Sequence, residues 1–168
     1  MKSQKIKVQH LLHAIIFIAV LIPANSFSQT PNFTGEWKIN EEKSELGEGR
    51  MRGATRLVIK HSDDEMSIER TSMGRSGEAF TSNEKMTLDG KECENMVNTR
   101  KKISSATWAE DGKSLNITSS MTFSRDGNTM EIKSTENWML SAENELTIDA
   151  VTQTPRGERI RKIVYDKQ

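Results

Sequence analysis

The side chains that could do chemistry in this sequence are charged or polar residues on the apolar faces of alternating segments. Arg70 continues the apolar face of residues 66–68, Glu84 and Glu136 interrupt two later apolar faces, and His61 ends another. A buried charge needs a partner, so an internal ion pair of Arg70 with Glu84 or Glu136 is one interpretation. A bulge that shifts the alternation, or a solvated mouth of the fold, would also account for these positions.

A binding site for a small molecule is the sharper interpretation. Such sites are mostly apolar and use a few polar groups to fix the orientation of the ligand. We therefore hypothesise that Arg70, with His61 or a glutamate, orients the head group of a small amphiphile. The candidate lining of its tail consists of Met66, Met86, Met121 and Trp138. Methionine suits an adaptable pocket, and it suits an ordinary core with few aromatic residues equally well.

The other reactive residue types form no recognisable catalytic motif. After residue 28 the sequence holds one histidine, His61, and one cysteine, Cys93. This widely spaced pair predicts neither a zinc site nor a Cys–His nucleophile, and the sequence has no serine elbow, phosphate loop or dinucleotide fingerprint. We therefore expect no metal and no cofactor, and a non-enzymatic role is favoured. An isomerase or hydrolase that uses buried carboxylates is the weakest alternative.

The charge of the chain argues against a nucleic-acid partner. Lys plus Arg number 24 and Asp plus Glu number 24, so the formal net charge is zero. Lys2, Lys5 and Lys7 lie in a leading segment without acids, so the rest of the chain is mildly acidic. Binding through phosphate neutralisation needs the opposite sign. The hydrophobic fraction of 34% with mixed charge is typical of a globular domain.

The first residues have the three-part pattern of a secretory signal peptide. A basic start precedes an apolar run over residues 14–22, and Pro23 is followed by the small residues Ser26 and Ser28. The run is far shorter than the roughly 20 residues of a membrane span, so we expect no stable span, with an uncleaved anchor as the alternative. We predict a signal peptide over 1–28, a single domain over 29–168, and export to the periplasm or the cell exterior.

The rest of the chain alternates with a period of two, which is typical of antiparallel strands with one buried face. Asp-Gly pairs and other turn residues separate the alternating segments, as tight hairpins require. The pattern predicts an all-β fold, an antiparallel up-and-down barrel of about eight to ten strands, with a β-sandwich as the alternative. A single helical turn capped by Asn40 is expected at residues 40–43. The clearest strand segments are 56–61, 66–69, 79–88, 115–123, 130–140 and 146–150.

The segment Phe33–Ser44, FTGEWKINEEKS, resembles the start of small exported lipocalin-like proteins of bacteria, which begin Phe-x-Gly-x-Trp-x-Leu-Asn-x-x-Lys-Ser. Trp108 before an Asp-Gly-Lys hairpin and the ending Tyr165–Gln168 are similar too. The likeness covers most of residues 33–168, although only the first dozen are distinctive. The sequence departs from true lipocalins in having neither a Thr-Asp-Tyr element nor a disulfide.

Within this resemblance, Gly35 and Trp37 match the Gly-x-Trp element of true lipocalins. In that family the Trp lies across the closed end of the barrel, and an Arg of the last strand packs against it. The resemblance therefore implies that Arg159 or Arg161 lies over the Trp37 ring. From the residues alone, Gly35 permits a tight turn into the first strand, and Trp37 is a large apolar plug.

Two functions follow as expectations. The first is non-covalent binding of a small apolar or amphipathic ligand inside the barrel. The second is a barrel filled by its own side chains, which serves as an interaction module of the cell envelope. In that case its outer faces and the loops 47–53 and 74–77 would contact a protein partner of unknown identity.

Overall fold

The computed structural model describes residues 30–47, 53–74, 76–125 and 127–168, so the predicted signal peptide and most of the loop 47–53 lie outside the described residues. The described chain forms ten antiparallel strands, which confirms the all-β, up-and-down prediction. No helix among the described residues is long and apolar enough to cross a membrane. The strands are β1 (Gly35–Ile39), β2 (Arg56–His61), β3 (Glu65–Met73), β4 (Ala79–Thr87), β5 (Cys93–Val97), β6 (Arg100–Trp108), β7 (Ser114–Arg125), β8 (Asn128–Ala142), β9 (Glu145–Thr154) and β10 (Gly157–Lys167).

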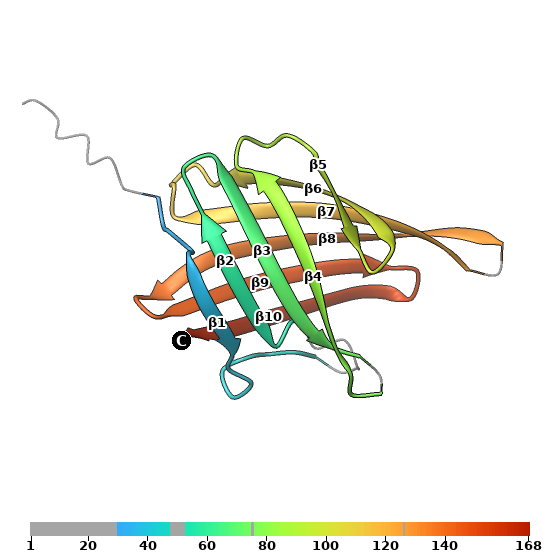
Figure 1. The fold of residues 1–168 in the computed structure, drawn as a ribbon, viewed down its shortest axis with the longest axis horizontal. Coiled ribbons are helices and arrows are strands. Elements are labelled where there is room, and N and C mark those ends of the chain that lie inside the picture. The colour runs from blue at the N-terminus through green and yellow to red at the C-terminus, as the bar shows by residue number, and fades with distance from the viewer. Residues whose placement is uncertain (1–29, 48–52, 75, 126) are drawn as a thin grey trace, which may run out of the picture.

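All ten strands belong to one sheet, in the order β4-β3-β2-β1-β10-β9-β8-β7-β6-β5. The sheet curls until its edge strands β4 and β5 meet, which gives a nearly closed barrel rather than a sandwich (Figure 1). Side chains bridge the seam between these edges. Asn95 donates its Nδ2–H to the Lys85 carbonyl at 3.0 Å and accepts the Lys85 amide at 2.8 Å. The Thr87 amide donates to Cys93 Sγ at 3.4 Å.

The reversals between strands follow the predicted turn residues. Asp89-Gly90 and Asp111-Gly112 lie between consecutive strands, and both glycines have positive φ. Asn98 and Thr99, with φ of 47° and 64°, form the β5–β6 reversal. Asn40 accepts the Lys43 amide on its Oδ1 at 3.1 Å, so the expected capped turn is present, as a turn rather than a helix.

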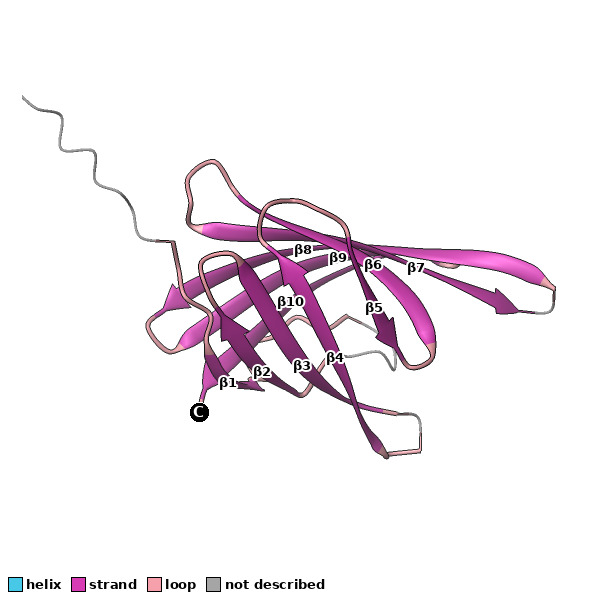
Figure 2. Cartoon of the chain, turned by 45° about the horizontal axis from the view of Figure 1, so that its top comes forward, coloured by secondary structure: helices cyan, strands magenta, loops and turns pink. Residues whose placement is uncertain are grey.

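The barrel has two different ends, which both views show (Figures 1 and 2). At the end called the closed end lie the turns 62–64, 88–92, 109–113 and 143–144 and the C-terminus. The hairpin tips after β3, β5, β7 and β9 lie at the other end, called the open end. The core fills the half nearer the closed end, and its largest fully buried side chains are Trp37, Trp138, Tyr165, Phe33, Leu57, Ile59, Met66, Ile68, Met86, Leu115, Leu146 and Ile148.

Trp37 plugs the closed end. Its side chain is fully buried, and its indole N–H donates to the Phe33 carbonyl at 2.9 Å. The cation over its ring is Lys167 Nζ, 5.4 Å from the ring centroid, rather than the expected Arg159 or Arg161. The strand register explains this difference. Trp37 pairs directly with Lys167, whereas Arg161 lies six residues earlier on β10, opposite Ala150.

Gly35 makes room for the aliphatic part of Lys167. A Cβ added at Gly35 would lie 2.8 Å from Lys167 Cε, and the φ of Gly35 is +147°. The backbone conformation therefore favours glycine, and an added Cβ would also displace the flexible end of Lys167.

Candidate functional site

A layer of charged side chains crosses the middle of the barrel. Arg70 of β3 lies 3.2 Å from Glu84 of β4, measured from Nε to Oε1, and 2.9 Å from Glu136 of β8, measured from Nη2 to Oε2. Lys102 of β6 places its Nζ 2.6 Å from Glu84 Oε2. Each of these four residues occupies an inward position of its strand. The alternation of the sequence predicts this orientation for Arg70, Glu84 and Glu136. The internal ion pair anticipated as one interpretation is therefore present, with both glutamates joined to Arg70.

Trp138 links this charged layer to the core. Its indole N–H donates to Glu136 Oε2 at 2.8 Å, and the Arg70 guanidinium lies 5.2 Å from the centroid of its ring. Burial opposes the ionisation of Glu136, but Arg70, Lys102 and this indole more than offset it and lower the pKa of the carboxyl to about 2. The carboxylates hold Arg70 charged despite its burial, and its pKa is raised. Arg70 and Glu136 are thus both charged at neutral pH.

Between the levels of Glu136 and Lys102 in the charged layer, a row of hydroxyl side chains lines the inner wall. Ser104, Ser119, Ser134 and Thr152 lie directly opposite one another across β6, β7, β8 and β9. Ser104 is 1% exposed, and its Oγ has no hydrogen-bond partner in the part of the chain that the structure describes. A buried hydroxyl is normally paired with protein, water or ligand, so this one marks a place where a polar partner belongs.

The sequence-predicted site residues divide between two regions. Arg70, Glu84, Glu136 and Trp138 come together in and beside the charged layer, as described above. Met66 and Met86 are fully buried in the core on the closed side. Met121 lies on the open side, opposite Ile132, and is partly exposed.

His61 lies apart from Arg70, at the closed end. It pairs with Met66, which precedes Arg70 on β3 by two inward positions. Its ring stacks on Phe33 and Trp108, with centroid separations of 5.7 Å and 5.8 Å, and its Nδ1 accepts the Phe33 amide at 3.2 Å. Burial lowers the pKa of His61, and Asp63 opposes this in part.

A pH-dependent stability is expected from His61. Since its pKa in the folded state lies below the reference value of 6.5, the unfolded chain binds the proton more readily. The contribution to the free energy of unfolding is fully present above pH 6.5 and is lost as the pH falls from 6.5 towards the lowered pKa. Urea unfolding at pH 7.5 and 5.5 measures this loss, and His61→Gln should remove that part of the dependence. An NMR titration that gives a His61 pKa above 6.5 would contradict the prediction.

Sequence reasoning missed the remaining inner-face groups. Lys102 and Ser104 belong to a strand whose inner face is polar at one end, so no apolar alternation marked it. The hydroxyl row is detectable only from register, because its members come from four strands.

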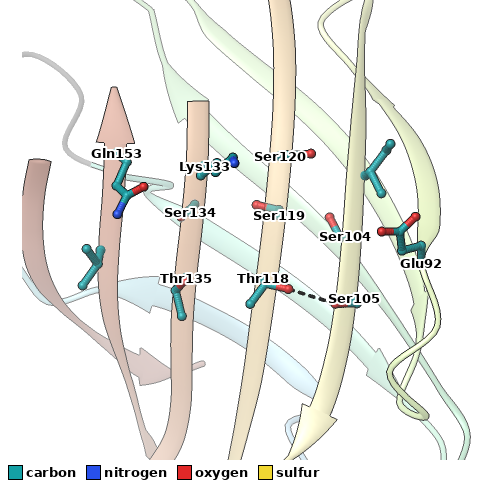
Figure 3. A pocket seen from close by; sticks show the side chains of 12 residues that line it. Glu92, Ser104, Ser105, Thr118, Ser119, Ser120, Lys133, Ser134, Thr135 and Gln153 are labelled. Atoms are coloured by element: carbon teal, nitrogen blue, oxygen red, sulfur yellow. Dashed lines mark hydrogen bonds between the residues drawn. The ribbon is translucent and has the colours of Figure 1, made fainter. Parts of the chain in front are cut away.

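The outer wall carries a shallow groove of about 330 Å³ over β6 to β9 (Figure 3). Its lining is rich in hydroxyls, and Ser105 and Thr118 are joined by a hydrogen bond of 2.9 Å. A second groove of about 420 Å³ over β8 to β10 shares Thr135 and Val151 with the first and reaches the exposed Ile160. The alternation of the sequence predicts a solvated outer face here. It does not predict the grooves, because each groove spans several strands and the pattern describes one strand at a time.

The fold and the charged layer define an up-and-down ten-stranded barrel with an internal polar site. The chain matches no protein-family model and no curated protein. Its structure is similar to that of the zebrafish ileal bile-acid-binding protein, which was crystallised in complex with cholic acid. The TM-score is 0.49, with 12% sequence identity over 81% of this chain and 98% of the zebrafish chain. We take this likeness as one of fold alone.

Proposed function

We propose that the barrel binds a small amphipathic molecule non-covalently, in the half of its interior that faces the open end. The observation that carries the proposal is the buried Ser104 hydroxyl, which occupies an inward position of β6 and has no hydrogen-bond partner among the described residues. The polar end of the ligand contacts the hydroxyl row beside the charged layer. Its apolar part lies against Met121 and Ile132, which occupy the next inward positions on β7 and β8.

The division of the inner wall supports this placement. On the closed side, Met66 and Met86 are packed in the core with at most 1% exposure. Those on the open side, including Met121 and Ile132, are partly exposed. Small hydroxyl side chains leave space between strands where large apolar residues would fill it. The ligand therefore fits beyond the charged layer rather than within the core.

The setting of this function is also part of the proposal. The signal-peptide pattern of residues 1–28 supports export, so the ligand would be met in the periplasm or outside the cell. The mass of the chain recovered from its own export route tests this, since a cleaved chain lacks these residues.

Binding is tested by isothermal titration calorimetry with three ligands that share a ten-carbon tail: decanoate, decanol and decyltrimethylammonium. We expect one-to-one binding of at least one of them. Ser119→Leu fills the inner wall and should weaken this binding by about tenfold or more, equivalent to about 1.4 kcal/mol. The matched control is Ser120→Leu, the next residue on β7, whose side chain faces outwards.

The thermal unfolding of both variants shows that they fold. Absence of binding by all three ligands, down to affinities of about 1 mM, would overturn the proposed function. Equal binding by Ser119→Leu and Ser120→Leu would place the ligand elsewhere and overturn the site.

The two outer grooves favour a second candidate, an interaction module. They form one continuous surface through Thr135 and Val151, and Ile160 is 71% exposed at its margin. This candidate predicts that the three ten-carbon ligands fail to bind and that Ile160→Asp abolishes retention of a protein partner from the envelope. The interior hydroxyl without a partner favours the first candidate.

A further inference from the structure

We infer that the ligand is an anion, that its acidic group binds at Lys102 beside the hydroxyl row, and that it enters through the open end. This inference rests on the proposed function and adds the chemical class of the ligand to it.

The first argument is the charge of the inner wall on the open side. Arg100, Lys102 and Arg159 occupy inward positions there, by their register with Val97, Met121 and Thr152. No Asp or Glu occupies an inward position on that side in the strand residues that the structure describes. Arg70 and Lys102 balance the two glutamates of the charged layer, so Arg100 and Arg159 give this wall a surplus of positive charge in a chain with no net charge. A partly buried surplus of cations favours an anionic ligand.

The second argument is the chemistry of Lys102. Its ammonium group has three N–H donors, and the contact with Glu84 Oε2 at 2.6 Å uses one of them. Its side chain is only 14% exposed, so a further acceptor within the barrel would interact with it in a weakly screened environment. Ser104 lies two residues along β6 on the same face, and its buried hydroxyl can donate to the same anion. Lys102 and Ser104 together therefore offer a charge and a directed donor.

The third argument is the difference in charge between the two ends. The turns of the closed end are strongly acidic, whereas the described residues at or next to the hairpin tips of the open end are mixed in charge, with Arg100, Arg156 and Arg159 beside Glu78 and Glu158. The acidic turns repel an anion from the closed end, so the open end is the more favourable entrance. The acidic residues of the closed-end turns are Asp63, Asp64, Asp89, Glu92, Glu110, Asp111 and Glu143, against Lys91 and Lys113.

The ten-carbon ligands test the inference because they differ only in the head group. We expect decanoate to bind at least about tenfold more tightly than decanol, and decyltrimethylammonium to bind most weakly, corresponding to about 1.4 kcal/mol or more between the first two. Raising the salt concentration should weaken decanoate binding and leave decanol binding unchanged. Equal affinity for decanoate and decanol would overturn the anion inference and leave the proposed function standing.

Lys102→Met tests the residue itself, and Lys101→Met is its matched control. Lys101 is the preceding residue, points outwards and pairs with Glu94 at the surface. Lys102→Met should reduce the preference for decanoate over decanol to less than about threefold, whereas Lys101→Met should leave it intact. An undiminished preference in a folded Lys102→Met variant would overturn the assignment.

Arg159→Met keeps the inference testable if Lys102→Met does not fold. Arg159 makes no contact with the charged layer, and its loss should reduce the preference for decanoate without affecting decanol binding. An unchanged preference in this variant would show that the positive charge of the inner wall does not select the ligand.

Discussion

Replacing Arg70 with methionine is expected to destabilise the barrel by about 3 to 5 kcal/mol, because it leaves buried carboxylates without their main counter-charge. Glu84 is 3% exposed and would keep only Lys102. Glu136 would keep the indole N–H of Trp138, which is a weaker partner than a guanidinium. The loss is measured as the free energy of unfolding in urea at pH 7.

Two further variants separate loss of charge balance from loss of packing. Arg70→Met combined with Glu136→Gln removes one charge of each sign and leaves the Glu84–Lys102 pair intact. This double variant should be more stable than Arg70→Met alone, since no carboxylate is left uncompensated.

Arg56→Met is the surface control. Arg56 pairs with Glu36 and Glu69, but its side chain is 40% exposed, so its loss should destabilise the barrel much less than the loss of Arg70. If Arg70→Met cost no more than Arg56→Met, the charged layer would be solvated and would not depend on pairing.

The strand alternation predicted the orientation of the charged residues because burial of one face imposes a period of two. Arg70, Glu84 and Glu136 are inward, and Arg70 contacts Glu84 on the neighbouring strand β4 and Glu136 on β8, which is distant in the sequence. Alternation predicts whether a side chain points into or out of the barrel, but not its position along the barrel axis. For this reason it left His61 as a partner for Arg70, whereas register separates them.

The strands β5 and β6 show where periodicity fails. Lys102 and Ser104 occupy inward positions of β6, where the alternation rule expects apolar residues. These positions lie beside the charged layer, so the fold accepts polarity there. The segment that carries the candidate anion site was therefore the one that the pattern did not identify. A polar inner face is compatible with a binding site, but it removes the alternation of apolar and polar residues by which a strand is predicted from sequence.

The cation over Trp37 illustrates a limit of family resemblance. The resemblance implied an arginine of the last strand, and the structure places Lys167 of the last strand there. The interaction is the same in kind, but the residue is set by the direct pairing of Trp37 with Lys167. The motif thus predicted the kind of contact, a cation over the Trp37 ring, but not the residue that makes it.

Trp37→Ala is expected to destabilise the barrel by about 3 to 5 kcal/mol, because it leaves a cavity at the closed end. The Trp37 side chain is fully buried, and Gly35, Lys167 and Phe33 are arranged around it. Their backbone positions are held by the pairing of β1 with β2 and β10, so the site cannot collapse freely. Thermal and urea unfolding measure the loss, and an unchanged melting curve would show that Trp37 does not plug the barrel.

Two controls separate the volume of Trp37 from its polar contacts. Trp37→Phe keeps much of the volume but loses the hydrogen bond to the Phe33 carbonyl, so it should cost clearly less than Trp37→Ala. Lys167→Met keeps an aliphatic chain beside Gly35 and removes only the cation, which should cost about 0.5 to 1 kcal/mol. A cost for Lys167→Met as large as that for Trp37→Ala would mean that the cation, and not the bulk of the indole, holds the closed end together. The predicted order places volume first, because the indole is buried among apolar neighbours and the lysine is exposed.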